Sequence, residues 1–272
     1  MKQLLRFFAV VVVCLLSRGL LSAQESTNGI DPEALIERIL AVDRAQRVEI
    51  KDVIFEAEYV EGEEKDDKGF VEKVRFEKKI YIKYLEDTSW YHADYLAYYK
   101  NGKLQKRKDL EKQADKRKQK QEKRKIFNIS YPVLAPFSPE YRDRYEVIYE
   151  GVPAEPVESY VCHHFTVVSR EEHENSINGE YYFEAATFHL VRVDFTPARL
   201  VNKTMFDVKE LMMSIVYGPT PDGFWLPRRL DVRGREKTAL LLKTEFSWTE
   251  YYRNPIFNSG VSDDIFEVKD GE

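Results

Sequence analysis

The 272-residue sequence contains little cysteine and little glycine, and beyond its first residues it has no apolar run long enough to cross a membrane. Its two cysteines are Cys14 and Cys162. Since Cys14 lies in an N-terminal apolar run that we expect to be removed, Cys162 has no partner for an intramolecular disulfide. The 12 glycines are few for a nucleotide enzyme, and no phosphate-binding glycine loop occurs. The fold must therefore be held without covalent cross-links.

Motifs of catalysis are also missing. There is no Gly-x-Ser-x-Gly and no His-Glu-x-x-His, and the acidic residues 63–67 lack the alternating spacing of a calcium loop. His92 and Asp94 can form a base–carboxylate pair, but no nucleophile motif accompanies them. We therefore expect no enzymatic activity and no cofactor. A secreted hydrolase remains the least favoured alternative.

One triplet, Cys162-His163-His164, combines metal-binding residue types. On a strand, Cys162 and His164 would share a side, whereas His163 would point away from both. The pair can form a thiol–imidazole site or supply two metal ligands. No further cysteine exists to complete a soft metal site, so a buried cysteine beside a surface histidine is the favoured interpretation, and no metal is expected.

Residues 1–23 have the features of a secretory signal. Lys2 and Arg6 precede an apolar run from Phe7 to Leu16, and Leu21-Ser22-Ala23 places a small residue before Gln24. Ten apolar residues are too short to span a bilayer comfortably. The sequence therefore predicts a soluble periplasmic protein whose single mature domain covers residues 24–272.

The net charge of −5 conceals two regions of opposite sign. Residues 103–125 contain 12 Lys and Arg against 4 Asp and Glu, whereas the remainder of the predicted mature chain has 27 basic and 43 acidic residues. Such an acidic body argues against a nucleic-acid binder. The basic segment has Leu110 and Ala114 as its only apolar side chains between Lys106 and Lys125, which favours a solvated helix or a mobile loop inserted in the domain.

The remaining pattern is one amphipathic helix followed by strands. Asp31-Pro32 is a helix start, and Leu35, Ile36, Ile39 and Leu40 follow at helical spacing. From Phe70 to Tyr84, apolar residues then alternate with charged ones, and Asn101-Gly102 is typical of a tight hairpin.

Several further alternating segments bring the count to about 10–11 antiparallel strands. Because strand twist accumulates, a sheet of this size must curl. The expected fold is mainly antiparallel β with α: an incomplete half β-barrel wrapped around the N-terminal amphipathic helix, plus the charged helical insertion at residues 103–125.

Three stretches are similar to the periplasmic LolA/LolB-type superfamily, which includes outer-membrane lipoprotein-sorting proteins and envelope sensor domains. They are the entry helix at Ala34–Leu40 with the strand at residues 49–59, the hairpin at residues 179–194, and the C-terminal segments at residues 251–258 and 263–266. The resemblance implies a half-barrel whose hydrophobic cavity accepts acyl chains or an apolar peptide. It carries no individual functional residue over to this chain.

The leading hypothesis is a periplasmic carrier that shelters lipoprotein acyl chains or another apolar ligand, and the alternative is a non-transporting envelope sensor or scaffold with an envelope protein partner. The predicted cavity-lining residues are Leu35, Ile39, Phe76, Ile80, Met213, Ile215, Leu240, Leu242, Phe246 and Trp248. The predicted contacts with an anionic membrane surface or a partner are Lys106, Arg107, Lys108, Lys116, Arg117, Lys118, Lys123, Arg124 and Lys125.

Overall fold

The computed structural model describes residues 30–65, 69–85, 89–123, 133–172, 176–200, 202–203, 206–238 and 243–266. The predicted signal peptide lies outside these residues. The chain divides into two compact units, residues 1–35 and residues 36–272. The described part of the first unit is the start of helix α2 (Pro32–Glu49), and all other described residues belong to the second unit.

Helix α2 begins where the sequence predicts. The Asp31 carboxylate accepts a hydrogen bond from the backbone N–H of Glu33 at 3.0 Å, and the Asp31 carbonyl accepts one from the N–H of Leu35 at 3.2 Å. Pro32 occupies the first helical position, where a missing N–H costs nothing. These contacts satisfy N-terminal amides that have no partner within the helix.

The second unit contains the sheet and a second helix, α3 (Arg107–Lys123). Three short 3-10 helices are η1 (Ala135–Phe137), η2 (Arg142–Arg144) and η3 (Asp263–Ile265). The strands are β1 (Asp52–Lys65), β2 (Gly69–Tyr84), β3 (Ser89–Lys100), β4 (Lys103–Leu104), β5 (Tyr145–Gly151), β6 (Cys162–Ser169), β7 (Ile177–Glu184), β8 (Leu190–Pro197), β9 (Asn202–Lys203), β10 (Phe206–Pro219), β11 (Trp225–Thr238) and β12 (Lys243–Phe257).

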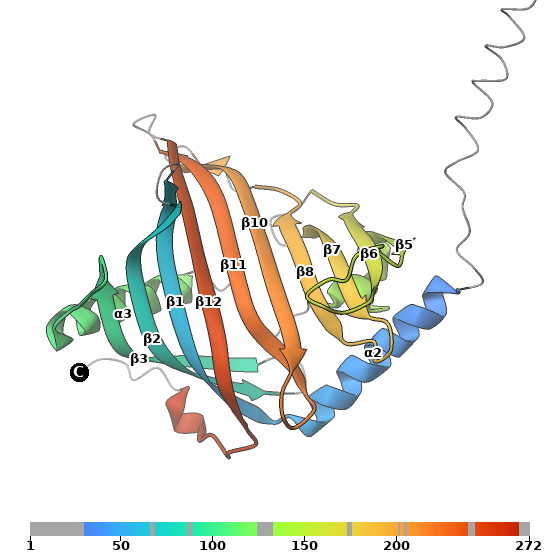
Figure 1. Ribbon diagram of the computed structural model, residues 1–272, viewed down its shortest axis with the longest axis horizontal. Helices are drawn as coiled ribbons and strands as arrows, with labels where there is room; N and C mark the ends of the chain where they lie inside the picture. The colour runs from blue at the N-terminus through green and yellow to red at the C-terminus, as the bar shows by residue number, and fades with distance from the viewer. Residues whose placement is uncertain are drawn as a thin grey trace, which may run out of the picture. The chain divides into compact units, whose positions relative to one another are not determined.

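The described strands form one antiparallel sheet in the order β4-β3-β2-β1-β12-β11-β10-β8-β7-β6-β5, with β9 paired to β10 beside this path. The last strand returns to pair with the first, so β1 and β12 lie in the interior of the sheet. Within the described residues the end strands β4 and β5 do not pair, so the sheet stays open (Figure 1). The predicted fold class, an open half-barrel with a helix, is confirmed.

The β3–β4 turn shows why the predicted hairpin forms. Asn101 and Gly102 have φ values of 50° and 73°, and Lys100 pairs with Lys103 across them. Two successive residues with positive φ make the turn whose twist matches that of the flanking strands, and Asn-Gly is the pair that adopts it most readily.

The core lies on the face of the sheet that carries the alternating apolar residues. One cluster combines Ile50, after α2, with Val53, Phe55, Ile80 and Tyr252. A second is aromatic, since Phe76 stacks on Tyr98 at 4.8 Å between ring centroids and Tyr59 packs beside them.

Helix α3 corrects the expectation that the basic segment has no contact face. Leu110 packs against the aromatic cluster, Ala114 is buried, and the Arg117 guanidinium lies 4.3 Å and 4.5 Å from the ring centroids of Tyr59 and Phe76. These positions recur at helical spacing. The guanidinium group is planar and weakly hydrated, so it stacks on aromatic rings where an ammonium group would stay in water.

Candidate ligand-binding cavity

A cavity of about 120 Å³ opens between helix α2 and the sheet. The helix contributes one face, since its lining residues follow helical spacing. The lining residues are Ile39, Val42, Asp43, Gln46, Arg47, Ile50, Phe55, Ile82, Tyr84, Ser89, Tyr91, Val133, Leu134, Phe183, Phe188, His189, Leu190, Tyr217, Trp225, Leu226, Pro227 and Tyr252. The cavity is therefore mostly apolar, with a limited set of polar groups that can orient a ligand.

Gln46 ties the helix to the sheet at this cavity. Its Nε2 atom donates a hydrogen bond to the Trp225 carbonyl at 2.9 Å, and its Oε1 atom accepts one from the Trp225 N–H at 2.7 Å. The side chain thus pairs with both backbone groups of the first residue of β11. These two hydrogen bonds fix the distance between α2 and β11, and this distance sets the width of the cavity.

Two charged side chains line the cavity, and they neutralise each other. Arg47 Nε donates a hydrogen bond to Asp43 Oδ2 at 2.7 Å, one helical turn away. The Arg47 side chain keeps 46% of its surface exposed. The pair therefore marks a solvent-facing part of the wall and supplies no unpaired charge to the interior.

Four tyrosines from four strands line the cavity: Tyr84 from β2, Tyr91 from β3, Tyr217 from β10 and Tyr252 from β12. Burial raises the pKa of each phenol, and that of Tyr84 rises to about 12. All four are therefore neutral near pH 7 and remain available as hydrogen-bond donors.

Phe188 and His189, in the turn between β7 and β8, form another part of the wall. Phe188 has a φ of 64°, a left-handed conformation that is an outlier for a bulky residue. Its ring stacks on His163 at 5.9 Å, and the Arg38 guanidinium lies 5.3 Å from its centroid. These contacts hold a strained residue in place.

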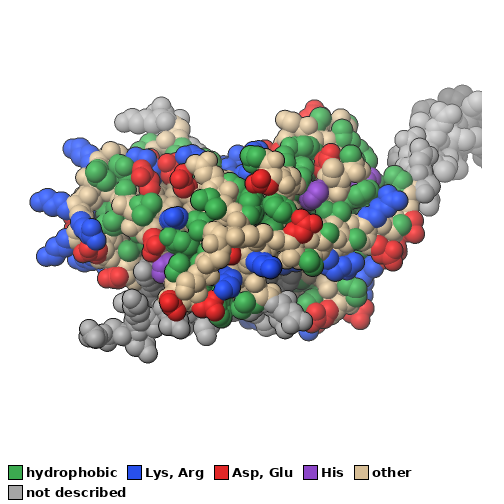
Figure 2. Space-filling view, turned by 90° about the horizontal axis from the view of Figure 1, so that it is seen from below, with side chains coloured by type: hydrophobic (Ala, Val, Ile, Leu, Met, Phe, Trp, Pro, Cys, Tyr) green, Lys and Arg blue, Asp and Glu red, His purple; other side chains and the backbone are tan. Residues whose placement is uncertain are grey.

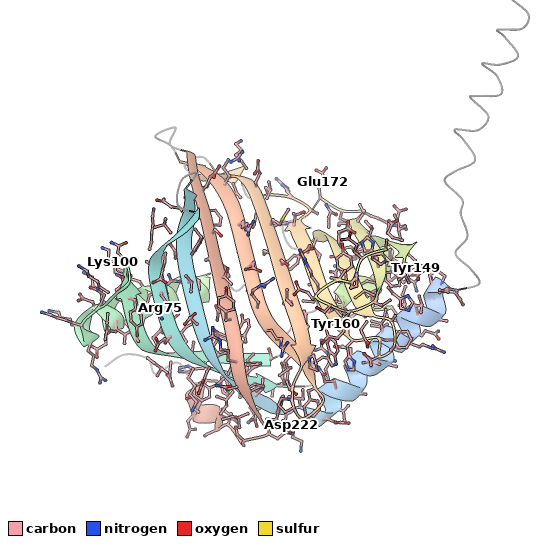
Figure 3. The ribbon with its side chains drawn as sticks, in the orientation of Figure 1. Arg75, Lys100, Tyr149, Tyr160, Glu172 and Asp222 are labelled. Carbon is pink, nitrogen blue, oxygen red and sulfur yellow. The ribbon has the colours of Figure 1, made fainter. Side chains whose placement is uncertain are left out.

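Two histidines lie in or beside that turn, the partly buried His189 and the buried His163. The His189 ring stacks on Trp225 at 5.1 Å, and His163 Nδ1 lies 3.0 Å from the hydroxyl of Tyr149, which Figure 3 labels. Burial lowers the pKa of both imidazoles. Neutral rings are the form that packs among aromatic side chains at lowest desolvation cost.

The predicted lining residues are dispersed. Ile39 lines the cavity, Phe76 and Ile80 lie inside the packed clusters, and Met213 and Ile215 are each 5% exposed. Leu35 is buried in the first unit. Leu240 and Leu242 lie outside the described residues.

The last two predicted lining residues, Phe246 and Trp248, belong to β12. The Phe246 ring lies directly over Gly234, where a Cβ atom would approach its Cζ atom to 2.3 Å. The ring of Trp248 packs on Tyr59 at 5.3 Å. Both rings thus cover the sheet itself.

The Cys162 and His164 side chains make separate contacts. Cys162 is buried with Val191 and Trp225, and burial raises the pKa of its thiol to about 11. His164 Nε2 lies 2.6 Å from Glu180 Oε2, and its ring stacks on Tyr182. Among the described residues no group of three or more His, Cys, Asp or Glu side chains is arranged to hold a metal ion.

The other chemical pair named from the sequence does form. His92 Nε2 lies 3.0 Å from Asp94 Oδ1 at an exposed position of β3. The Asp94 side chain keeps half of its surface in solvent. The pair therefore lies on the surface and contributes no side chain to the cavity wall.

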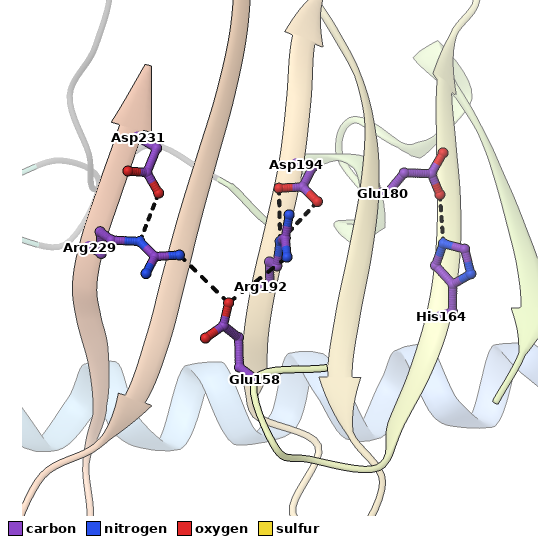
Figure 4. Close-up of polar contacts among 7 residues, drawn as sticks. All are labelled: Glu158, His164, Glu180, Arg192, Asp194, Arg229 and Asp231. Atoms are coloured by element: carbon purple, nitrogen blue, oxygen red, sulfur yellow. Dashed lines mark hydrogen bonds and ion pairs between the residues drawn. The ribbon is translucent and has the colours of Figure 1, made fainter. Parts of the chain in front are cut away.

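Charged residues of β8 and β11 lie near one another on the face of the sheet opposite the buried valines of β8 (Figure 4). Arg192 pairs with Asp194, and Arg229 pairs with Asp231 at 2.7 Å. Glu158 lies 3.9 Å and 3.7 Å from the two guanidinium groups. These side chains are between 24% and 38% exposed, so they contribute little to stability and keep this face soluble.

The segment between β5 and β6, which contains Glu158, also contacts a residue of the cavity wall. Tyr160, labelled in Figure 3, packs against Trp225 with 5.1 Å between ring centroids. The segment therefore supports Trp225, which is both a wall residue of the cavity and the partner of Gln46.

The basic side chains predicted as surface contacts differ in their surroundings. Lys106, Arg107, Lys108 and Lys116 are exposed, and Lys and Arg side chains project at the end of the molecule where α3 lies (Figure 2). Arg117 instead faces the aromatic cluster and donates to Glu61 at 3.1 Å. Lys118 and Lys123 belong to α3, and Arg124 and Lys125 lie outside the described residues. No described helix is long and apolar enough to cross a membrane.

The fold has matches among solved structures. A DUF1329 family protein from Desulfovibrio piger matches at 14% identity, with 88% of this chain and 98% of that chain covered and a TM-score of 0.46. A putative outer membrane lipoprotein-sorting protein domain from Vibrio parahaemolyticus matches at 12% identity, with coverages of 85% and 97% and a TM-score of 0.37.

A LolA superfamily protein from Nitrosomonas europaea matches at 8% identity, with coverages of 88% and 99% and a TM-score of 0.36. No protein-family model and no curated protein matches the sequence.

Proposed function

We propose that this chain is an exported binding protein of the bacterial periplasm that takes an apolar group, such as the end of an acyl chain, into the cavity between α2 and the sheet. The observation that carries the proposal is the cavity itself, because a largely apolar hollow is held open by the Gln46–Trp225 hydrogen bonds instead of being filled by core side chains. Burial of each CH2 group there would contribute about 0.8 kcal/mol.

The size of the cavity limits what it can enclose. About 120 Å³ is close to the roughly 150 Å³ of an engineered cavity that binds benzene, and below the ~300–1,000 Å³ of most small-molecule sites. A ring or a few carbons of a chain fits inside, while the rest of a longer ligand would extend past Arg47.

The experiment is a titration of delipidated protein with a fluorescent acyl probe. Saturable binding is expected, and Val42→Trp, which fills the cavity from α2, should weaken it at least tenfold. Val48→Trp is the matched control on the same helix, since Val48 is 79% exposed. A wild-type protein that shows no saturable binding would contradict the proposal.

The small volume also favours a second candidate, a non-transporting envelope sensor or scaffold that uses its surface. The exposed basic residues of α3 and the preceding turn offer an electrostatic contact with an anionic membrane, each contributing about 1 kcal/mol. Sedimentation with phosphatidylglycerol vesicles tests this candidate. Binding lost in the triple variant Lys106→Glu, Arg107→Glu and Lys108→Glu, and lost at high salt, supports it. Equal binding to phosphatidylcholine vesicles contradicts it.

A further inference from the structure

Tyr252 contributes to the cavity wall, and its buried hydroxyl group has no hydrogen-bond partner among the described residues. The residue is 7% exposed, and its ring is held edge-on against Phe55 with 5.6 Å between centroids. Its backbone pairs with Ala57 in the interior of the sheet. The hydroxyl is therefore rigidly placed, and an unpaired buried donor is an uncommon feature that calls for an explanation.

The chemistry around this hydroxyl selects the kind of group that can pair with it. Burial and the nearby Glu250 raise the pKa of Tyr252 well above its usual value, so the hydroxyl donates at every physiological pH. A ligand must then offer an acceptor. A neutral acceptor is favoured over an anion, because among the described residues Arg47 of the wall is already bound by Asp43, and Lys78 is already bound by Glu250.

We propose that Tyr252 is the specificity-determining residue of the cavity and that it donates a hydrogen bond to an uncharged carbonyl oxygen, as in an ester, amide or ketone, of a ligand whose apolar part fills the hollow. This inference rests on the proposed function and narrows its ligand class to neutral amphiphiles. The polar side chains of the wall then hold the carbonyl end, and the aliphatic and aromatic side chains hold the remainder.

The cavity volume suggests three probes of nearly equal shape: ethylbenzene without an acceptor, acetophenone with a neutral carbonyl, and benzoate with a charge. Calorimetric titration should rank acetophenone as the tightest of the three for the wild-type protein. Tyr252→Phe, which removes only the hydroxyl, should weaken acetophenone about tenfold, equivalent to about 1.4 kcal/mol, and leave ethylbenzene unchanged or tighter.

Tyr181→Phe is the matched control. The Tyr181 hydroxyl is also buried without a partner among the described residues, but the side chain packs against Phe137 and is not part of the cavity wall. It should leave the affinity for all three probes unchanged. Thermal unfolding of both variants without probe checks that each has folded.

The outcomes separate this inference from the function on which it rests. If acetophenone binds Tyr252→Phe as tightly as it binds the wild type, or if benzoate binds more tightly than acetophenone, the inference is overturned and the apolar cavity function stands. If none of the three probes binds the wild type, both are overturned.

Discussion

The Nζ atom of Lys78 lies 2.9 Å from Oε1 of Glu250 inside the protein, with exposed side-chain fractions of 6% and 10%. Lys78 occupies a position of β2 whose neighbours on the same face are the buried Phe76 and Ile80. Its ammonium group also lies 5.5 Å and 5.7 Å from the ring centroids of Tyr59 and Tyr95. A charged pair thus separates the two apolar clusters of the sheet.

Replacing one partner of this ion pair should lower the free energy of unfolding far more than replacing both. Lys78→Met leaves the Glu250 carboxylate buried without its partner, and we expect the free energy of unfolding to fall by about 3–5 kcal/mol. The double variant Lys78→Met with Glu250→Leu removes both charges and should recover most of that loss. Urea denaturation of the wild type, the single variants Lys78→Met and Glu250→Leu, and the double variant measures the coupling directly.

Lys73→Met is the control for the lysine substitution, because Lys73 pairs with Glu63 at the surface and should change stability by less than about 1 kcal/mol. If Lys78→Met proves as mild as Lys73→Met, the ion pair is not buried in solution.

The contact of Arg117 with the Tyr59 and Phe76 rings should hold α3 on the sheet. Arg117→Ala removes a cation–π interaction of about 1 kcal/mol, so hydrogen exchange of the α3 amides should accelerate about fivefold. Arg117→Lys keeps the charge but loses the planar stack, and it should behave much like the alanine variant.

Lys116→Ala is the control on the neighbouring, exposed position and should leave exchange unchanged. Exchange that is equally fast in the wild type and in Arg117→Ala would mean that the guanidinium does not anchor the helix.

The sequence predicts this fold well where one periodicity decides the structure. The Phe70–Tyr84 alternation corresponds to β2, and the Asp31-Pro32 start corresponds to α2, because local preference and burial agree at both places. The contact face of α3 could not be recognised from the sequence in this way, because one of its three residues is Arg117 and a pattern that counts only apolar residues omits it.

The cavity is harder to predict for a different reason. Its wall joins residues far apart in the chain, such as Gln46 and Trp225, which only strand register brings together. Tyr84 follows the alternating pattern, yet nothing local distinguishes it from an ordinary core tyrosine. The positive φ of Phe188 has no sequence signal, because bulky residues rarely adopt it.

Alkaline pH should destabilise the protein. Burial raises the pKa of Cys162 from 9.0 to about 11 and that of Tyr84 from 10.0 to about 12. Above pH 9 the unfolded chain therefore binds fewer protons than the folded one, so the free energy of unfolding should fall as pH rises from about 9 toward 12. Urea midpoints at pH 7, 9, 10 and 11 measure this trend.

The substitutions Cys162→Ala and Tyr84→Phe should each reduce the slope of that dependence, because each removes one group that ionises only on unfolding. A wild-type midpoint that stays constant up to pH 11 would contradict the assignment of these groups as buried.

The paired hydrogen bonds between Gln46 and Trp225 lead to a prediction about stability and, for one variant, about its dependence on pH. Gln46→Leu leaves the Trp225 N–H and carbonyl without their partner, and the free energy of unfolding should fall by about 1–3 kcal/mol. Arg44→Leu, at an exposed position of the same helix, should have little effect.

Gln46→Glu tests the geometry more sharply because the ionised carboxylate can accept from the Trp225 N–H but cannot donate to its carbonyl. At pH 7 this variant should be less stable than the wild type, whereas near pH 4 a protonated carboxyl can supply both bonds again. We expect the stability difference from the wild type to shrink as pH falls, and the hydrogen exchange of the Trp225 amide to approach that of the wild type at the same pH. A difference that is independent of pH would show that the Trp225 carbonyl does not need the side-chain donor.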